Sequence, residues 1–239
     1  MANTREYFAV IHDCLKYGVE DPVISARLDE LGYPGAELDA LNLDLTAAEG
    51  AYNLITTPKG EQVAATQTFD PQLACVGQDL SDLRAMMNNN LERADPLFIQ
   101  LGLNEKQPRG QDDFLGYAVR VFTSGAALSA ADIAPLAKRK WDTARFTAAM
   151  TQATQVQALN DEQEAAKSAS VAATAHLYDL IDALDAKFRP LAKDARRGLA
   201  KIPGALAKMQ LEKSVPNKPQ RPADKKASQK LAKGQTPNT

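Results

Sequence analysis

The chain has 239 residues, with 28 Lys and Arg against 30 Asp and Glu, and is 44% hydrophobic but only 6% aromatic. This length suffices for one large or two small domains, and 41 alanines with few aromatic residues favour helices over strands. No apolar run approaches the roughly 18 residues that cross a bilayer. The first residues also lack the apolar stretch of a secretory signal, so we expect a cytoplasmic protein.

Charge is distributed unevenly along the chain. Residues 1–186 contain 14 Lys and Arg against 27 Asp and Glu, whereas residues 187–239 contain 14 against 3. An acidic body with a basic end indicates a polyanionic partner, such as nucleic acid or an anionic membrane, or docking of the basic end on the acidic body. A solubilising tail without a ligand is the alternative.

The basic end is also poor in apolar residues. Residues 213–239 contain four prolines and no aromatic residue, so they bury too little apolar surface to offset the entropy lost on ordering, and we predict a disordered tail. Without aromatic rings to stack on bases, such a tail would bind nucleic acid through phosphates alone. The candidate polyanion contacts are Lys213, Lys218, Arg221, Lys225, Lys226, Lys230 and Lys233.

The first long helical pattern follows the Gly-Tyr-Pro-Gly turn at residues 32–35. Its apolar residues recur at spacings of 3 and 4, which places them on one stripe of an amphipathic helix. They are Leu38, Leu41, Leu45, Ala48, Tyr52 and Ile55. Pro58 and Gly60 then predict a kink or a loop, with helix resuming over residues 61–68.

A second helical pattern follows Asp70 and Pro71, which have the form of an N-cap and a first-turn proline. Its apolar stripe consists of Leu73, Val76, Leu80, Leu83, Met87, Ala94 and Phe98. Gly102 lies between two leucines and predicts a glycine cap at the end of this helix.

The pattern begins again after a polar loop. The apolar segment 114–122 resembles the opening segment 7–11, and Ser129 predicts the start of another helix. Its apolar face continues through Trp141 to Ala153, and a further stripe extends from Ala169 to Ala195.

The region between these two stripes, residues 151–170, has two interpretations. No glycine or proline lies between Pro135 and Pro190, which indicates one continuous helix of about 60 residues, roughly 90 Å long at 1.5 Å per residue. Alternatively, Asn160, Asp161 and Glu164 form a capping box at a hairpin turn. We favour the turn, because so long a helix needs partners along its whole length.

The two halves of the chain resemble each other weakly. Leucines and glycines align at offsets of 95 to 97: Leu38 with Ile133, Leu41 with Leu136, Leu80 with Leu177, Leu83 with Leu180, and Gly102 with Gly198. We therefore predict an all-α fold over residues 1–212, with short extra helices. Its centre would be an elongated four-helix bundle of two antiparallel long-helix hairpins, produced by a tandem duplication with approximate repeats 4–103 and 112–199.

Few residues suit catalysis or metal binding. His12 and Cys14 are two positions apart, so on a helix they point to different sides. His176 is the other histidine, and no Glu-x-x-His motif of a di-metal bundle is present. Glycine-rich nucleotide loops and the hydrolase serine motif are also missing, so we predict no catalytic, cofactor-binding or metal-binding residues.

Residues 193–213 form a basic amphipathic pattern whose apolar residues are Leu199, Ile202, Leu206 and Met209. This pattern is typical of helices that lie on a membrane surface. Pro203 and Gly204 interrupt it, however, which favours a short helix capping the bundle.

Together these observations predict a non-enzymatic structural or protein-interaction protein, with an acidic helical body and a flexible basic tail. We expect its partner to be another protein or a second copy of itself. The alternatives are a nucleic-acid-associated protein that uses the basic tail, and a peripheral membrane binder that uses residues 193–213.

Overall fold

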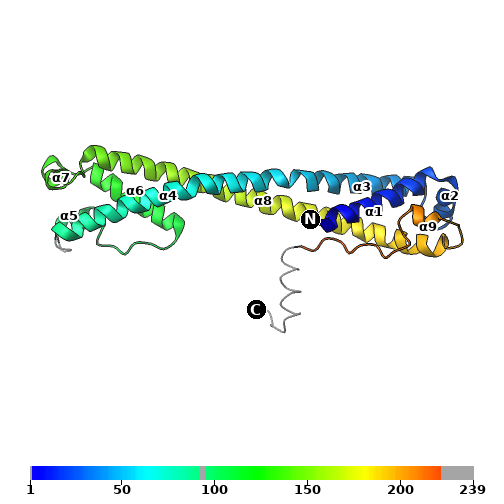
Figure 1. The fold of residues 1–239 in the computed structure, drawn as a ribbon. Coiled ribbons are helices and arrows are strands. Elements are labelled where there is room, and N and C mark those ends of the chain that lie inside the picture. Colours follow the sequence, from blue (N-terminus) through cyan, green and yellow to red (C-terminus); the bar gives the residue numbers. More distant parts are fainter. Residues whose placement is uncertain (1, 92–94, 222–239) are drawn as a thin grey trace, which may run out of the picture. The chain divides into compact units, whose positions relative to one another are not determined.

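The computed structural model describes residues 2–91 and 95–221, which form helices and no strand (Figure 1). The all-α prediction is therefore confirmed for this part of the chain. Its helices are α1 (Ala2–Glu20), α2 (Pro22–Glu30), α3 (Gly35–Leu54), α4 (Thr56–Asn90), α5 (Pro96–Gln100), α6 (Gln111–Ala126), α7 (Ala130–Ala137), α8 (Thr143–Gly198) and α9 (Ala205–Lys208).

The chain divides into two compact units, each with its own core. Unit 1 comprises residues 1–57 and 171–239, and unit 2 comprises residues 58–170. The long helix α8 contributes residues 143–170 to unit 2 and residues 171–198 to unit 1.

In unit 1 the core lies between α1, α3 and the second part of α8 (Figure 1). Each helix places an apolar stripe in this core, and the largest contributors include Tyr7, Phe8, Ile11, Leu38, Leu45, Leu184 and Phe188. Met209 and Leu211, at and just after the end of α9, complete the core at one end. The predicted stripe of Leu38, Leu41, Leu45 and Ala48 is confirmed as a buried face.

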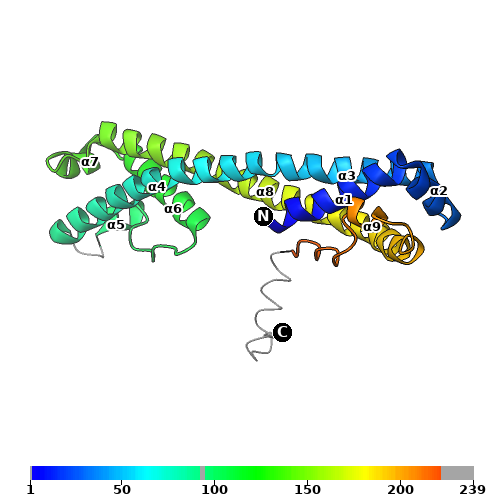
Figure 2. The same ribbon diagram turned by 45° about the vertical axis from the view of Figure 1, so that its right-hand side comes forward.

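In unit 2 the core lies between α4, α6 and the first part of α8 (Figure 2). Trp141 contacts two other aromatic rings in this core. Its ring stacks on that of Phe122, with the ring centroids 6.1 Å apart, and lies tilted against that of Phe146, with the centroids 5.1 Å apart. Leu80 and Leu83 of α4 are fully buried in the same core. The prediction that they lie on the apolar stripe of a helix is therefore confirmed.

The predicted hairpin turn in residues 151–170 is wrong, since α8 is one helix of 56 residues. Asn160 caps nothing: its side chain accepts a hydrogen bond from Gln111 at 2.6 Å and donates to Asp112 at 2.7 Å, both at the start of α6. The helix finds the partners it needs along its length by packing into the cores of both units.

The predicted interruption near Pro58 lies three residues earlier, at Ile55, between the end of α3 and the start of α4. The predicted helix start at Asp70 and Pro71 is wrong, because α4 passes through both residues. Pro58 lies in the first turn of α4. Backbone N–H groups in this turn have no acceptor within the helix, so the N–H that proline lacks costs no hydrogen bond. Pro71 lies inside the helix, between the buried residues Phe69 and Val76, whose packing offsets the lost hydrogen bond.

The predicted continuation to Phe98 is wrong as well: α4 ends at Asn90, and Phe98 lies in α5. Ala94, predicted on the same stripe, lies outside the described residues.

Two predicted caps are confirmed. Gly102 has a φ of +70° and directly follows the C-cap residue of α5, with the N–H of Leu103 donating to the carbonyl of Phe98 at 3.0 Å. The hydroxyl of Ser129 accepts the N–H of Asp132 at 3.2 Å and begins α7.

The order of the helices repeats along the chain, but at an offset of 108 residues. The starts of α2 and α7 are Pro22 and Ala130, the starts of α3 and α8 are Gly35 and Thr143, and the ends of α4 and α8 are Asn90 and Gly198. The predicted offsets of 95 to 97 do not follow this order, because Leu38 lies in α3 whereas its expected counterpart Ile133 lies in α7.

The turns repeat at the same offset. Gly32 and Lys140 both have positive φ values, +88° and +67°. In each case the next residue, Tyr33 or Trp141, donates its N–H to a leucine carbonyl five residues earlier, at 2.9 and 3.1 Å. The turn at Gly102 recurs at Gln210, whose φ is +53°.

Among the described residues no single helix is both long and apolar enough to cross a membrane. Together α6 and α7 reach the length and composition, but they meet at a bend of 108° and their large apolar side chains belong to the core of unit 2.

Candidate interaction surface

Helix α3 has two apolar faces, of which only one is buried in unit 1. The inner face carries Leu38, Leu41, Leu45 and Ala48 and packs against α1 and α8. The outer face of α3 is a second stripe, at spacings of 4, 3, 4, 3 and 4, and all its residues are exposed. It consists of Ala36, Ala40, Leu43, Ala47, Gly50 and Leu54.

The two leucines of the outer face are the exposed large apolar side chains of α3. Leu43 is 71% exposed and Leu54 is 69% exposed. A single exposed leucine is ordinary on a protein surface, but two leucines on one stripe with only Ala and Gly between them form a continuous apolar strip.

The repeat at 108 residues provides an internal comparison for this stripe. The equivalent residues on α8 are also exposed, and they are Ala144, Ala148, Thr151, Gln155, Ala158 and Glu162. The two leucines of α3 therefore correspond to a threonine and a glutamate on α8. Since the same helical arrangement forms with polar residues at these positions, the fold does not require leucine there.

Acidic residues border the outer face along its first half. Glu37 and Asp39 are exposed, and Asp44 forms an ion pair with Lys187 of α8, with the Nζ and Oδ2 atoms 2.5 Å apart. The second half of the stripe is bordered by uncharged residues, among them Thr46 and Asn53.

A different charged surface lies where the first part of the basic end meets α8. Lys218 donates to Asp182 at 2.6 Å, and Arg221 bonds to both Asp179 and Asp182. Hydrogen bonding from Lys218, then from Arg221, holds the pKa of Asp182 below its usual range. Asp179 and Asp182 of α8 are thus paired with basic residues of the same chain.

Residues 211–221, here called the C-terminal strap, follow α9 and lie on unit 1 (Figure 1). Arg196 fixes the start of the strap through Nε, which donates to the carbonyl of Leu211 at 2.9 Å, and through a second bond to the carbonyl of Lys213. Pro219 is buried. Although disorder was predicted from residue 213 onward, the strap has a defined course as far as residue 221.

The strap accounts for three of the seven predicted polyanion contacts. Lys218 and Arg221 are engaged with α8, and the side chain of Lys213 is exposed. The other four, Lys225, Lys226, Lys230 and Lys233, lie outside the described residues.

The basic amphipathic segment 193–213 turns its apolar residues into unit 1. Leu199 and Met209 are fully buried, and Ile202 and Leu206 pack against the same core. This face is covered by its own unit, as the predicted short capping helix requires.

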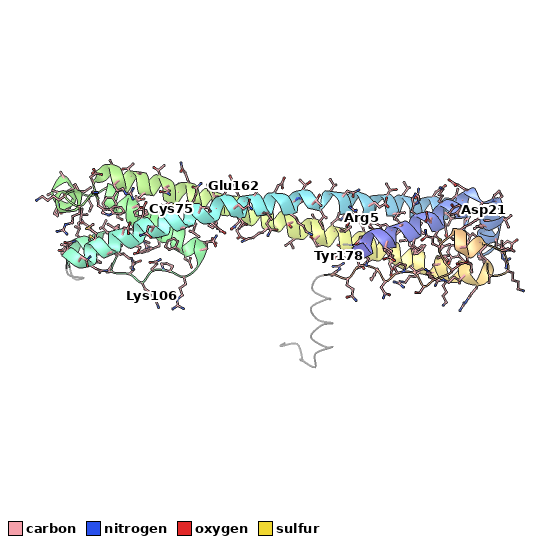
Figure 3. All side chains as sticks on the ribbon, in the orientation of Figure 1. Arg5, Asp21, Cys75, Lys106, Glu162 and Tyr178 are labelled. Atoms are coloured by element: carbon pink, nitrogen blue, oxygen red, sulfur yellow. The ribbon has the colours of Figure 1, made fainter. Side chains whose placement is uncertain are left out.

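The residues considered for chemistry lie apart from one another. The Nδ1 atom of His12 is 3.6 Å from a carboxylate oxygen of Asp13 on an open surface, and His176 is exposed on α8. Cys14 is buried in unit 1, whereas Cys75 is exposed on α4 (Figure 3). In residues 2–91 and 95–221, no three His, Cys, Asp or Glu side chains are grouped closely enough to hold a metal ion.

The outer face of α3 was not recognised from the sequence, although its spacing is visible there. The stripe of Leu38, Leu41 and Leu45 dominates the pattern, and three of the six outer residues are alanines, which any helix carries. The contrast with Thr151 and Glu162 became visible only when the structure gave the offset of 108.

Comparisons of the chain with protein-family models, curated proteins and solved structures find no match. Residues 2–91 and 95–221 define the class of the protein by their fold, which is all-α with two helical units.

Proposed function

We propose that this protein is a non-enzymatic interaction protein, built from two repeats of one helical arrangement, in which α3 of the first repeat presents an apolar face to protein partners. One observation carries the proposal: Leu43 and Leu54 are about 70% exposed on a single stripe of α3. The equivalent positions of α8 hold Thr151 and Glu162.

Solvent exposure of a continuous apolar strip is unfavourable for an isolated protein and favourable for one that covers it with a partner. Each fully buried leucine gains roughly 1.5–3 kcal/mol relative to leaving it exposed. A helical protein partner suits the strip, since a row at spacings of 4 and 3 matches the apolar row of a second helix.

The repeated order of helices supports the further proposal that the chain arose by tandem duplication, at an offset of 108. Each helical bundle is then built from both repeats: unit 1 combines α1, α2 and α3 with the end of α8, and unit 2 combines α6, α7 and the start of α8 with α4. In such a scaffold the two repeats share their cores but remain free to differ on their surfaces, as α3 and α8 do.

The alternatives are less well supported. Two of the three described tail cations, Lys218 and Arg221, are neutralised by Asp182 and Asp179, so a nucleic-acid function rests on Lys213 and on four lysines outside the described residues. A peripheral membrane function through residues 193–213 would need apolar side chains that are now buried in unit 1.

Site-specific photo-crosslinking in the native cells tests the proposal. A photoreactive amino acid replaces Leu43 in one version of the full chain and Thr151 in a matched control. We expect covalent protein adducts at position 43 and few at position 151. Equal labelling at both positions, or no adduct at position 43, would overturn the interaction function.

A further inference from the structure

The outer face of α3 has the spacing of a coiled-coil seam. Its residues alternate by 4 and 3 from Ala36 to Leu54, while the inner face of the same helix is already occupied by α1 and α8. We propose that this second seam pairs antiparallel with the α3 helix of a second copy of the chain. The inference rests on the proposed interaction function and names its partner.

Residue size along the seam favours an antiparallel pair. With the two-fold axis halfway between Leu43 and Ala47, Leu43 of one copy faces Ala47 of the second copy. By the same symmetry Leu54 faces Ala36, and Ala40 faces Gly50. Every leucine thus meets a small residue, so the two helices can approach closely and fill the space between them.

A parallel pair fits less well. Leu43 would then face Leu43 of the second copy and Leu54 would face Leu54, while alanine would face alanine and glycine would face glycine. The leucine layers would hold the helices apart and leave gaps at the small residues, which lose packing contacts.

Charge along the edges of the seam favours the same direction. In the antiparallel pair Glu37 lies beside Ala51 of the second copy, and Asp39 lies beside Asn53. The two copies of Asp44 meet near the axis, but each already has Lys187 of its own chain 2.5 Å away. In a parallel pair Asp39 would face Asp44 of the second copy on both sides, which is repulsive.

The seam is short, which sets the expected strength of the dimer. The next residues of the series are Thr57 and Glu61, so the apolar contact ends at Leu54. A contact limited to α3 is smaller than the roughly 1,600 Å² of a standard stable interface. We therefore expect a dimer that dissociates on dilution.

Sedimentation and light scattering of the full chain at increasing concentration test the pairing. The measured mass is expected to rise from 25.8 kDa toward twice that value. Leu43→Glu and Leu54→Glu should each abolish the rise, whereas Thr151→Glu, at the position equivalent to Leu43, should leave it unchanged. Circular dichroism checks that each variant stays helical. Leu43→Thr, which introduces the residue type found at the equivalent position 151, serves as a milder variant than Leu43→Glu.

Cysteine pairing tests the direction. In a Cys75→Ser background, Ala40→Cys and Gly50→Cys chains are oxidised separately and as a mixture. The antiparallel pair predicts rapid disulfide formation in the mixture and slow formation in either chain alone. Gly50 accepts a side chain freely, since nothing lies within 4 Å of an added Cβ. Rapid crosslinking of Ala40→Cys alone would indicate parallel pairing and overturn the proposal.

The outcomes separate this inference from the proposed function. A chain that is monomeric at every concentration, or a dimer that Leu43→Glu and Leu54→Glu leave intact, overturns self-pairing through α3. If the photo-crosslinker at position 43 then labels a different protein, the interaction function stands without the dimer. If it labels nothing, both are wrong.

Discussion

Tyr7 and Asp185, which are 178 residues apart in the chain, share a 2.8 Å hydrogen bond in the interior of unit 1. Burial, together with the bond to Asp185, holds the pKa of Tyr7 well above its usual range, so the phenol stays protonated and donates. Arg189 donates through Nε to the other oxygen of Asp185 at 2.7 Å. The carboxylate is thus satisfied on both sides, and it joins α1 to α8.

Removing the phenol hydroxyl should therefore destabilise the protein. Tyr7→Phe leaves a buried carboxylate oxygen without its donor, and such a loss costs about 1–3 kcal/mol. Urea unfolding followed by circular dichroism measures it. Tyr33→Phe removes a similar 2.9 Å bond to Asp194 at a partly buried site and should cost less. Equal losses for the two variants would show that burial of the Tyr7 pair does not matter.

Replacing two glycines of α6 by alanine should change the stability of the protein in opposite directions. A Cβ at Gly125 would lie 2.1 Å from the ring of Phe146, so Gly125→Ala forces the aromatic core of unit 2 to shift, at a cost of roughly 1–3 kcal/mol or more. Nothing lies within 4 Å of a Cβ at Gly116, and there alanine should stabilise by about 0.5–1 kcal/mol. Thermal melts of the two variants should move in opposite directions.

Local periodicity was sufficient to find the buried stripes of α3 and α4 but not the ends of the helices. Leu80, Leu83 and Met87 were placed correctly because a packed stripe needs only apolar residues at spacings of 3 and 4. Pro71 was misread because its cost to the helix is offset by buried neighbours. Asn160 was misread because its hydrogen-bond partners, Gln111 and Asp112, are nearly 50 residues away and leave no local signal.

The offset of 108 between corresponding helices was missed for a related reason. Leucines at helical spacing align at several offsets, so the residues that could distinguish them are those of the turns. The turn before α3 has Gly32, but the corresponding turn before α8 has Lys140 in the same left-handed conformation, which sequence patterns assign to glycine. The stripe of the outer face could be read from the sequence, but its exposure could not.

These two equivalent turns lead to a reciprocal prediction. Lys140 has a φ of +67°, a region in which a non-glycine residue costs roughly 1–2 kcal/mol, so Lys140→Gly should raise the melting temperature. Gly32→Lys places the same strain on the first turn, where φ is +88°, and should lower it. Differential scanning calorimetry of both variants checks the signs, and a stabilising Gly32→Lys would contradict the shared turn geometry.

The strap should make stability depend on pH in the acid range. Lys218 and Arg221 depress the pKa of Asp182 in the folded state. The ionised carboxylate therefore makes its full contribution to the free energy of unfolding above the pKa of Asp in the unfolded chain, about 3.9. This contribution is lost as pH falls through the lower pKa of the folded state. Asp182→Asn should therefore lower the free energy of unfolding at pH 7, by no more than about 1 kcal/mol for so exposed a pair. The difference from the unmodified chain should shrink below about pH 4.

A double-mutant cycle provides the control for the strap. In a Lys218→Ala, Arg221→Ala background the partners of Asp182 are missing, so Asp182→Asn should change urea stability little at any pH. An undiminished effect in that background would show that Asp182 acts through some other contact.

The two cysteines should differ sharply in reactivity toward a maleimide. Burial raises the pKa of the Cys14 thiol to about 12, so the thiolate that reacts is scarce, and the side chain is fully enclosed by unit 1. Cys75 is exposed on α4. We expect intact-mass spectrometry to find one adduct on the native chain, none on Cys75→Ser, and two adducts on the unmodified sequence in urea. A native Cys75→Ser chain that reacts as fast as the unmodified one would show that α1 opens readily from the core of unit 1.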